Sequence, residues 1–99
     1  MDVRLVVLHS PGPNWKQGGN FQEQDEGIVT KHVQHYKKLY EQGNLSLGGP
    51  YVDMDSGGMM VANGQITREE LEEFASSDPV VIAGLLKFEV KKWYVAMAK

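Results

Sequence analysis

The first apolar run of the chain, residues 3–8, is short and consists mainly of valine and leucine. A short β-branched run of this kind predicts a β-strand. Its apolar side chains fall on both alternating faces, so we expect both faces of the strand to be covered. Residues 10–25 then show no hydrophobic period and are rich in Pro, Gly, Asn and Gln. They predict a loop of a length that compact domains rarely contain without a functional reason.

Residues 26–42 carry the pattern of an amphipathic helix. At about 100° per residue, six apolar side chains form one stripe along it: Ile28, Val29, Val33, Tyr36, Leu39 and Tyr40. His32 falls inside this stripe, and His35 lies at its edge. Gly43 and Asn44 follow directly, and this pair predicts the left-handed backbone that ends many helices.

Two further strands are predicted at residues 45–50 and 58–62. The residues between them, 53–57, have the composition of a turn, so the two strands should form a hairpin. Pro50 cannot donate a hydrogen bond to a sheet ladder, which places the first of these strands at an edge or a bulge.

A second helix is predicted to start at Thr67, which has the spacing of a capping box with Glu70. Its buried side chains are expected to be Leu71, Phe74 and Ala75. After it, Asp78 and Pro79 restart a short helical turn that ends at Gly84.

Residues 86–90 alternate between apolar and charged side chains, as a half-buried strand does. The apolar phase then changes to Trp93, Val95 and Met97. A change of phase within one strand predicts a β-bulge near Lys91 and Lys92.

The predicted order of elements is therefore βαββαβ, the split βαβ arrangement of ferredoxin-like α+β domains, in one domain of residues 1–99. Two helices can cover one face of a four-stranded sheet, yet the strands are apolar on both faces. A second copy of the chain is the simplest cover for the other face, so we expect a homodimer formed through sheet faces. The expected contributors besides the last strand are Val3, Leu5, Val7 and Met59 or Val61.

Composition narrows the possible partners. The 99 residues include 10 basic and 13 acidic side chains, for a net charge of −3. Nucleic acids and anionic membranes favour basic surfaces, so neither is expected as a partner. No cysteine is present, which excludes disulfides, thiolate metal sites and a cysteine nucleophile. The sequence shows neither a signal peptide nor a membrane-spanning run, so a cytoplasmic protein is expected.

An ordered set of residues resembles the YciI-like (YCII-related) family. The set starts at His32 and continues through four further landmarks: Gly43, Gly49-Pro50, Asp78-Pro79 and Ala83-Gly84. The Gly12-Pro13-x-Trp15 segment and the Gly48-Gly49-Pro50 triplet resemble a subgroup with a longer first loop. The resemblance implies a dimeric ferredoxin-like α/β barrel and an active site at His32 and Asp78. One branch of the family removes chloride from a chlorinated hydroxyquinol, so lyase chemistry belongs to the range of the family.

His32 and Asp78 each have two interpretations. A histidine on a buried stripe is commonly a core residue bonded to a backbone carbonyl. An imidazole also titrates near neutral pH, so it is a suitable general acid or base. Aspartate before proline is a preferred start of a helical turn. The two roles of Asp78 are compatible, because one carboxylate oxygen can cap the turn while the other orients an imidazole. We expect the two side chains within hydrogen-bond reach or one water apart.

Other polar and aromatic residues complete the predicted site. Residues 10–25 are expected to wall or cover the pocket, with Trp15 near His32 or Gly49-Pro50, because lids exclude water from proton-transfer sites. The candidates for substrate contacts are Trp15, Tyr36, Gly49 and Pro50. No metal site is expected, since His32 and His35 lack further ligands at a suitable spacing.

Three classes of function remain open. The first is a small enzyme without a cofactor that uses His32 and Asp78 for proton transfer, of lyase or isomerase type, on a small aromatic or enol-like metabolite. The second is a non-catalytic module that binds a small ligand in the same pocket. The third is an accessory domain whose polar pocket is a remnant. The first is favoured because a buried imidazole costs free energy unless satisfied, and a nearby carboxylate both satisfies and activates it.

Overall fold

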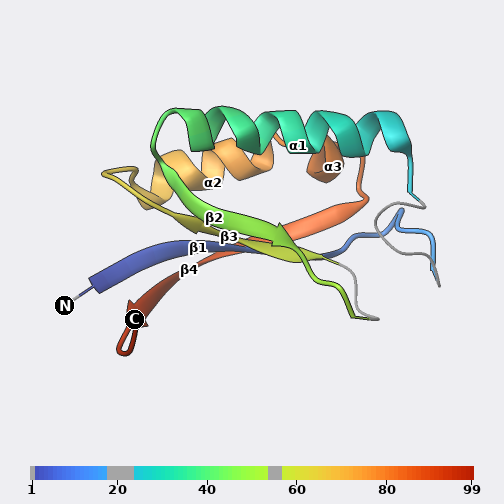
Figure 1. The fold of residues 1–99 in the computed structure, drawn as a ribbon. Coiled ribbons are helices and arrows are strands. Elements are labelled where there is room, and N and C mark those ends of the chain that lie inside the picture. The colour runs from blue at the N-terminus through green and yellow to red at the C-terminus, as the bar shows by residue number, and fades with distance from the viewer. Residues whose placement is uncertain (1, 18–23, 54–56) are drawn as a thin grey trace.

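The computed structural model describes residues 2–17, 24–53 and 57–99. Within them, antiparallel strands form a four-stranded sheet in the order β2-β3-β1-β4. The strands are β1 (Asp2–Pro11), β2 (Leu45–Pro50), β3 (Gly58–Ala62) and β4 (Leu86–Val95). The helices α1 (Glu26–Glu41), α2 (Arg68–Ser76) and α3 (Pro79–Ile82) lie together on one face of this sheet (Figure 1). The predicted βαββαβ order and ferredoxin-like α+β fold are confirmed, with α2 and α3 together in the place of the second helix.

The sheet presents one face to the helices and leaves the other open. Val7 is fully buried in the core cluster that includes Tyr36 and Leu39 of α1, and Leu5 packs against this cluster. Alternation along β1 therefore places Val3, Leu5 and Val7 on the helix face. The prediction that these three residues contribute to the second face is wrong. In a run that is apolar on both faces, the sequence does not show which set of alternate residues faces the helices. The open face instead carries the alternate residues of β1 and their partners in β3: Val6, Leu8, Met59 and Val61.

Strands β1 and β4 pair along their whole length. Their register runs without a shift from Asp2 opposite Val95 to Pro11 opposite Leu86, so the predicted bulge near Lys91 and Lys92 is wrong. The apolar phase changes for another reason. At this end the two strands reach the limit of the helical layer (Figure 1), where the helix face no longer needs apolar side chains. The sheet irregularity lies instead in the edge strand β2, between Leu45 and Leu47.

The starts of the helices follow the sequence signals closely. Asp25 caps α1 by accepting a hydrogen bond from the Ile28 amide. Both halves of the predicted capping box of α2 are present, with Thr67 and Glu70 each accepting from the backbone amide of the other. Asp78 caps α3, as predicted. These caps satisfy amides that a helix start otherwise leaves without partners.

The segment after β1 is tied to the connection between α3 and β4. The Gly12 amide donates to the Leu85 carbonyl at 2.8 Å, and the Asn14 amide donates to the Gly84 carbonyl at 2.8 Å. A Cβ atom on Gly12 would collide with the Gly84 carbonyl oxygen, so this close approach requires glycine. Within the predicted loop and the predicted turn, residues 18–23 and 54–56 lie outside the described residues.

None of the helices in the described part of the chain combines the length and apolar character needed to cross a membrane.

Candidate functional site

A pocket of about 710 Å³ opens between α1 and the strands β2 and β3. Small-molecule sites typically have volumes of about 300–1,000 Å³ and mostly apolar walls. The apolar lining comes from both sides of the pocket: Val29, Val33 and Tyr40 of α1, Leu45 and Pro50 of β2, Met60 of β3 and Leu86 of β4. His9, His32 and Tyr36 add buried polar side chains to this lining. The pocket therefore combines an apolar wall with a small convergent polar group.

His32 and Asp78 form the shortest side-chain contact in this group. The distance between His32 Nδ1 and Asp78 Oδ2 is 2.6 Å, which is typical of a charge-assisted hydrogen bond. Asp78 has no exposed surface, and His32 is 6% exposed. The expected approach of the two side chains is therefore present in the structure. With Nδ1 donating to the carboxylate, the proton-accepting lone pair of a neutral His32 is on Nε2.

Asp78 uses its two carboxylate oxygens for different tasks. Oδ2 contacts His32, while Oδ1 accepts a hydrogen bond from the Val80 amide at 3.1 Å. The capping and orienting roles considered for this residue are thus both compatible with its geometry. Because α3 is packed against α1, the cap holds the carboxylate at a fixed position beside the imidazole.

His9, from β1, is a third polar side chain of the site, and it is 3% exposed. Its Nε2 lies 3.4 Å from the Tyr36 hydroxyl and 3.9 Å from Asp78 Oδ2. Its ring stands edge-on to His32, with the ring centroids 5.6 Å apart and an interplanar angle of 89°. The Asp78 carboxylate therefore forms a hydrogen bond with His32, whereas His9 only lies near it.

Burial sets the protonation of the two side chains that flank the dyad. Burial and then the neighbouring His32 together lower the pKa of His9 from 6.5 to about 4, although the Asp78 carboxylate acts in the opposite direction. Burial, and then the Asp78 charge, raise the pKa of the Tyr36 hydroxyl well above its usual 10.0. Near neutral pH, His9 is uncharged and Tyr36 is protonated.

The other predicted residues fall into two groups. Tyr36, Gly49 and Pro50 line the pocket. Trp15 is not among the lining residues in the described part of the chain; it packs against the cluster of Val80, Leu85 and Leu86 beside α3. Its contact with substrate stays a prediction, as does cover of the pocket by residues 10–25.

His35 does not belong to the site. Its ring stacks on Phe74 with centroids 3.9 Å apart, and its Nε2 bonds to the Phe74 carbonyl oxygen at 2.7 Å. Among the described residues, no group of three or more His, Asp or Glu side chains is arranged to hold a metal ion.

His9 is the site residue that the sequence interpretation missed. It follows Leu5 and Val7 at a spacing of two, so it continues the buried face of β1. A histidine that takes the next inward position of an apolar strand is a detectable signal, since a buried polar side chain needs a partner. The assignment of residues 10–25 to a loop concealed it, because β1 continues to Pro11.

Comparisons with known proteins agree with this fold. The model of the YCII-related domain matches residues 3–94. One solved structure that resembles the chain is 5-chloro-2-hydroxyhydroquinone dehydrochlorinase (TftG) from Burkholderia phenoliruptrix AC1100, in complex with 2,5-dihydroxybenzoquinone. It shares 17% sequence identity, with a TM-score of 0.66 over 91% of this chain and 93% of that chain. None of the curated proteins matches the chain significantly.

The match of the family model to nearly the whole chain agrees with the ordered residues that first suggested the resemblance, and the ferredoxin-like sheet agrees with both. The chain belongs to the family of YCII-related domains.

Proposed function

We propose that the protein is a small-molecule enzyme in which His32 transfers protons and Asp78 orients it, without a cofactor. One observation carries the proposal: the buried carboxylate of Asp78 holds His32 Nδ1 at 2.6 Å in the wall of a ligand-sized pocket. A base held in one tautomer by a carboxylate is the arrangement that activates an imidazole for proton transfer.

The proposed reaction starts at His32 Nε2. This atom takes a proton from a carbon or hydroxyl of the substrate, and the resulting imidazolium is stabilised by Asp78. The electron pair left behind enters the conjugated system of the substrate. In a lyase reaction a leaving group departs with the displaced pair; in an isomerase reaction the proton returns to another atom. Either course balances protons and electrons without an oxidant or a reductant.

Tyr36 and His9 are suited to stabilising the charge that develops on the substrate. The raised pKa of Tyr36 keeps its hydroxyl protonated, so this side chain remains a hydrogen-bond donor. His9 remains neutral at the same pH, and it therefore adds no positive charge to compete with His32 for Asp78. Donors arranged in advance around developing charge are a large source of catalytic rate enhancement.

An aromatic or enol-like substrate fits the pocket best. Its walls are mostly apolar, and the ring of Tyr36 lies beside the two imidazoles, with its centroid 5.4 Å from that of His32. The solved structure of the dehydrochlorinase holds 2,5-dihydroxybenzoquinone, which is a compound of this kind. These observations support proton transfer on a planar, conjugated small molecule.

We also propose a homodimer formed through the open faces of two sheets. Leu47 of β2 and Trp93 of β4 lie on that face, with 61% and 45% of their surface exposed. Val6 and Val61 lie between them and are already shielded by their neighbours. Exposed apolar side chains on the sheet face opposite the helices indicate an interaction surface.

The proton-transfer proposal can be tested with 2,5-dihydroxybenzoquinone as a probe. Its ring C–H groups exchange with D₂O through tautomers, so proton NMR gives a rate without knowledge of the natural substrate. The wild-type protein should accelerate this exchange, and His32→Gln should lose about 10²–10⁴-fold of the acceleration. His35→Gln is the matched control, since His35 lies on the same helix but outside the pocket, and it should retain the activity.

Binding without acceleration would instead identify a ligand-binding module. Titration of the same probe into wild-type protein and His32→Gln separates that alternative from catalysis. Chloride release from 5-chloro-2-hydroxyhydroquinone then tests whether the reaction is of the lyase type.

A further inference from the structure

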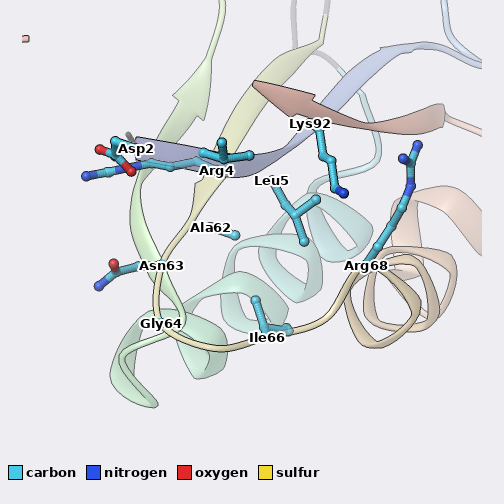
Figure 2. A pocket seen from close by; sticks show the side chains of 10 residues that line it. Asp2, Arg4, Leu5, Ala62, Asn63, Gly64, Ile66, Arg68 and Lys92 are labelled. Atoms are coloured by element: carbon cyan, nitrogen blue, oxygen red, sulfur yellow. The ribbon is translucent and has the colours of Figure 1, made fainter. Parts of the chain in front are cut away.

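A second cavity, of about 430 Å³, lies away from the His32–Asp78 pocket and shares no lining residue with it. It is bounded by the start of β1, the connection from β3 to α2, the first residue of α2 and Lys92 of β4 (Figure 2). The proposed function does not use it. Its volume nevertheless falls within the range of small-molecule sites, about 300–1,000 Å³.

Lys92 lies in the row of β4 side chains that faces the helices, and it lines this cavity. Leu86, Phe88 and Val90 precede it at a spacing of two and face the helices. The next position on that face is Lys92, paired with Leu5 of β1. Figure 2 shows its side chain extending from β4 into the space beside Leu5. A cation thus continues the row of β4 side chains that faces the helices, at an exposed position beyond the apolar residues of that row.

The charges around the cavity are predominantly positive. Arg68 is held in place by a hydrogen bond from Nη2 to the Val90 carbonyl at 2.6 Å and by Glu72 at 2.9 Å from Nε. Arg4 is paired with Asp2, which is the one carboxylate of the lining. Lys92 has no ion pair with any residue that the structure describes. Lys92 and Arg68, the latter ion-paired with Glu72 on its own helix, therefore border one cavity, an arrangement that an anion would stabilise.

The remaining lining of the cavity is largely apolar. Leu5 and Ile66 are half-buried against the main core cluster, and Ala62 is buried in it. Figure 2 shows Leu5 and Ile66 directed toward the same space from opposite sides. A ligand that satisfies this cavity needs both an anionic group and a compact apolar body.

We propose that this cavity binds a small organic anion, a carboxylate or a phosphate monoester carried on a compact apolar group. Lys92 and Arg68 hold the anionic group, and Leu5 and Ile66 contact the apolar part. Arg68 is anchored before the ligand arrives, so little side-chain entropy is lost when it binds. The site is independent of the His32–Asp78 dyad.

Backbone NMR titration with benzoate and with phenyl phosphate tests the proposal. Both probes should produce saturating shifts at Leu5, Ala62, Ile66 and Lys92, whereas benzyl alcohol, their neutral analogue, should not. Lys92→Gln should weaken binding about tenfold, as expected for the loss of one charge-assisted contact, and Lys92→Arg should restore it. Tighter binding of one probe identifies the anion class, because benzoate carries the carboxylate and phenyl phosphate the phosphoryl group.

Lys91→Gln is the matched control. Lys91 is adjacent in sequence, points to the opposite face of β4 and lies near Glu89. The Lys91→Gln variant should bind benzoate and phenyl phosphate as tightly as the wild-type protein does. Equal weakening in Lys91→Gln and Lys92→Gln, or shifts spread over all basic side chains, would show non-specific attraction and overturn the proposal. The absence of saturating shifts in the wild-type protein would overturn it as well.

Discussion

Asp78 and Asp25 perform the same structural task, so a comparison of the two isolates the chemistry of the site. Each carboxylate accepts a hydrogen bond from a backbone amide at the start of a helix, at 3.1 Å from Val80 and 3.2 Å from Ile28 respectively. Asp78 also holds His32. Asparagine preserves the cap but cannot stabilise an imidazolium. We therefore expect Asp78→Asn to lower turnover about 10²–10⁴-fold, as measured by the exchange of the quinone probe.

Asp25→Asn should leave the rate of that exchange unchanged. Circular dichroism and thermal unfolding of both variants establish that each is folded. Equal losses of activity in the two variants would mean that Asp78 serves as a cap and nothing more.

His9 makes stability depend on pH. Its folded-state pKa of about 4 lies below the usual 6.5, so the unfolded chain binds more protons between these two values. The contribution of the neutral imidazole to the free energy of unfolding is fully present above pH 6.5 and is lost as the pH falls toward 4. The total loss for such a shift is about 3 kcal/mol. Urea unfolding of the wild type and of His9→Gln at a series of pH values measures it, and the variant should show a weaker dependence on pH in this range.

The sequence was informative about some site residues and silent about another, for a physical reason. His32 and Asp78 stand at positions where a helix stripe and a helix cap predict their locations, and the fold brings these positions together. His9 requires knowledge of where β1 ends, and strand ends are poorly marked when a proline such as Pro11 still pairs within the sheet. Trp15 shows the opposite difficulty, since an aromatic ring in a loop can cover a pocket or pack beside a helix.

At the scale of elements, the capping box of α2 makes a separate prediction. Thr67 and Glu70 each satisfy a backbone amide of the other, and the hydrogen bonds from Thr67 lower the pKa of Glu70. Thr67→Ala should destabilise the protein by about 1 kcal/mol, measured by urea unfolding. Thr30→Ala, at an exposed position within α1, is the control and should be close to neutral. Glu70 stabilises the folded state above its unfolded pKa of 4.5, and this contribution falls as the pH drops through that region.

Elements with strong local signals were predictable almost to the residue. The α1 helix carries a long apolar stripe, an N-cap and a glycine after its end, and β3 has the bounds that its composition predicts. The phase of β1 and the regular register of β4 were not predictable, because both depend on which side chains the helices reach. The local pattern of apolar and polar residues does not show how far a layer of helices extends over a sheet.

At the scale of the whole molecule, we predict a dimer through the open sheet faces. Such an interface should bury at least about 1,200–2,000 Å² in total. Light scattering should therefore give a mass near twice the 11.1 kDa of one chain. Leu47→Lys and Trp93→Lys place charges on that face and should shift the equilibrium to monomers.

Ile82→Lys is the control for this prediction. Ile82 is 73% exposed but belongs to α3, on the opposite side of the sheet. It should leave the mass unchanged. A monomeric wild-type protein at micromolar concentration would contradict the proposed assembly and leave the open face without an occupant.

Because Asp78 both caps α3 and contacts His32, the proposed proton transfer depends on whether α3 remains folded. The carboxylate that orients His32 is held by α3, a helix of 4 residues, and a helix this short does not persist without its cap and its packing. When α3 frays, the imidazole loses its orienting partner although the sheet remains intact. Heat should therefore inactivate the protein before it unfolds, with the lost activity returning on cooling. The temperature limit of the proposed activity is then set by one helical turn, and improved packing of the main core would not raise it.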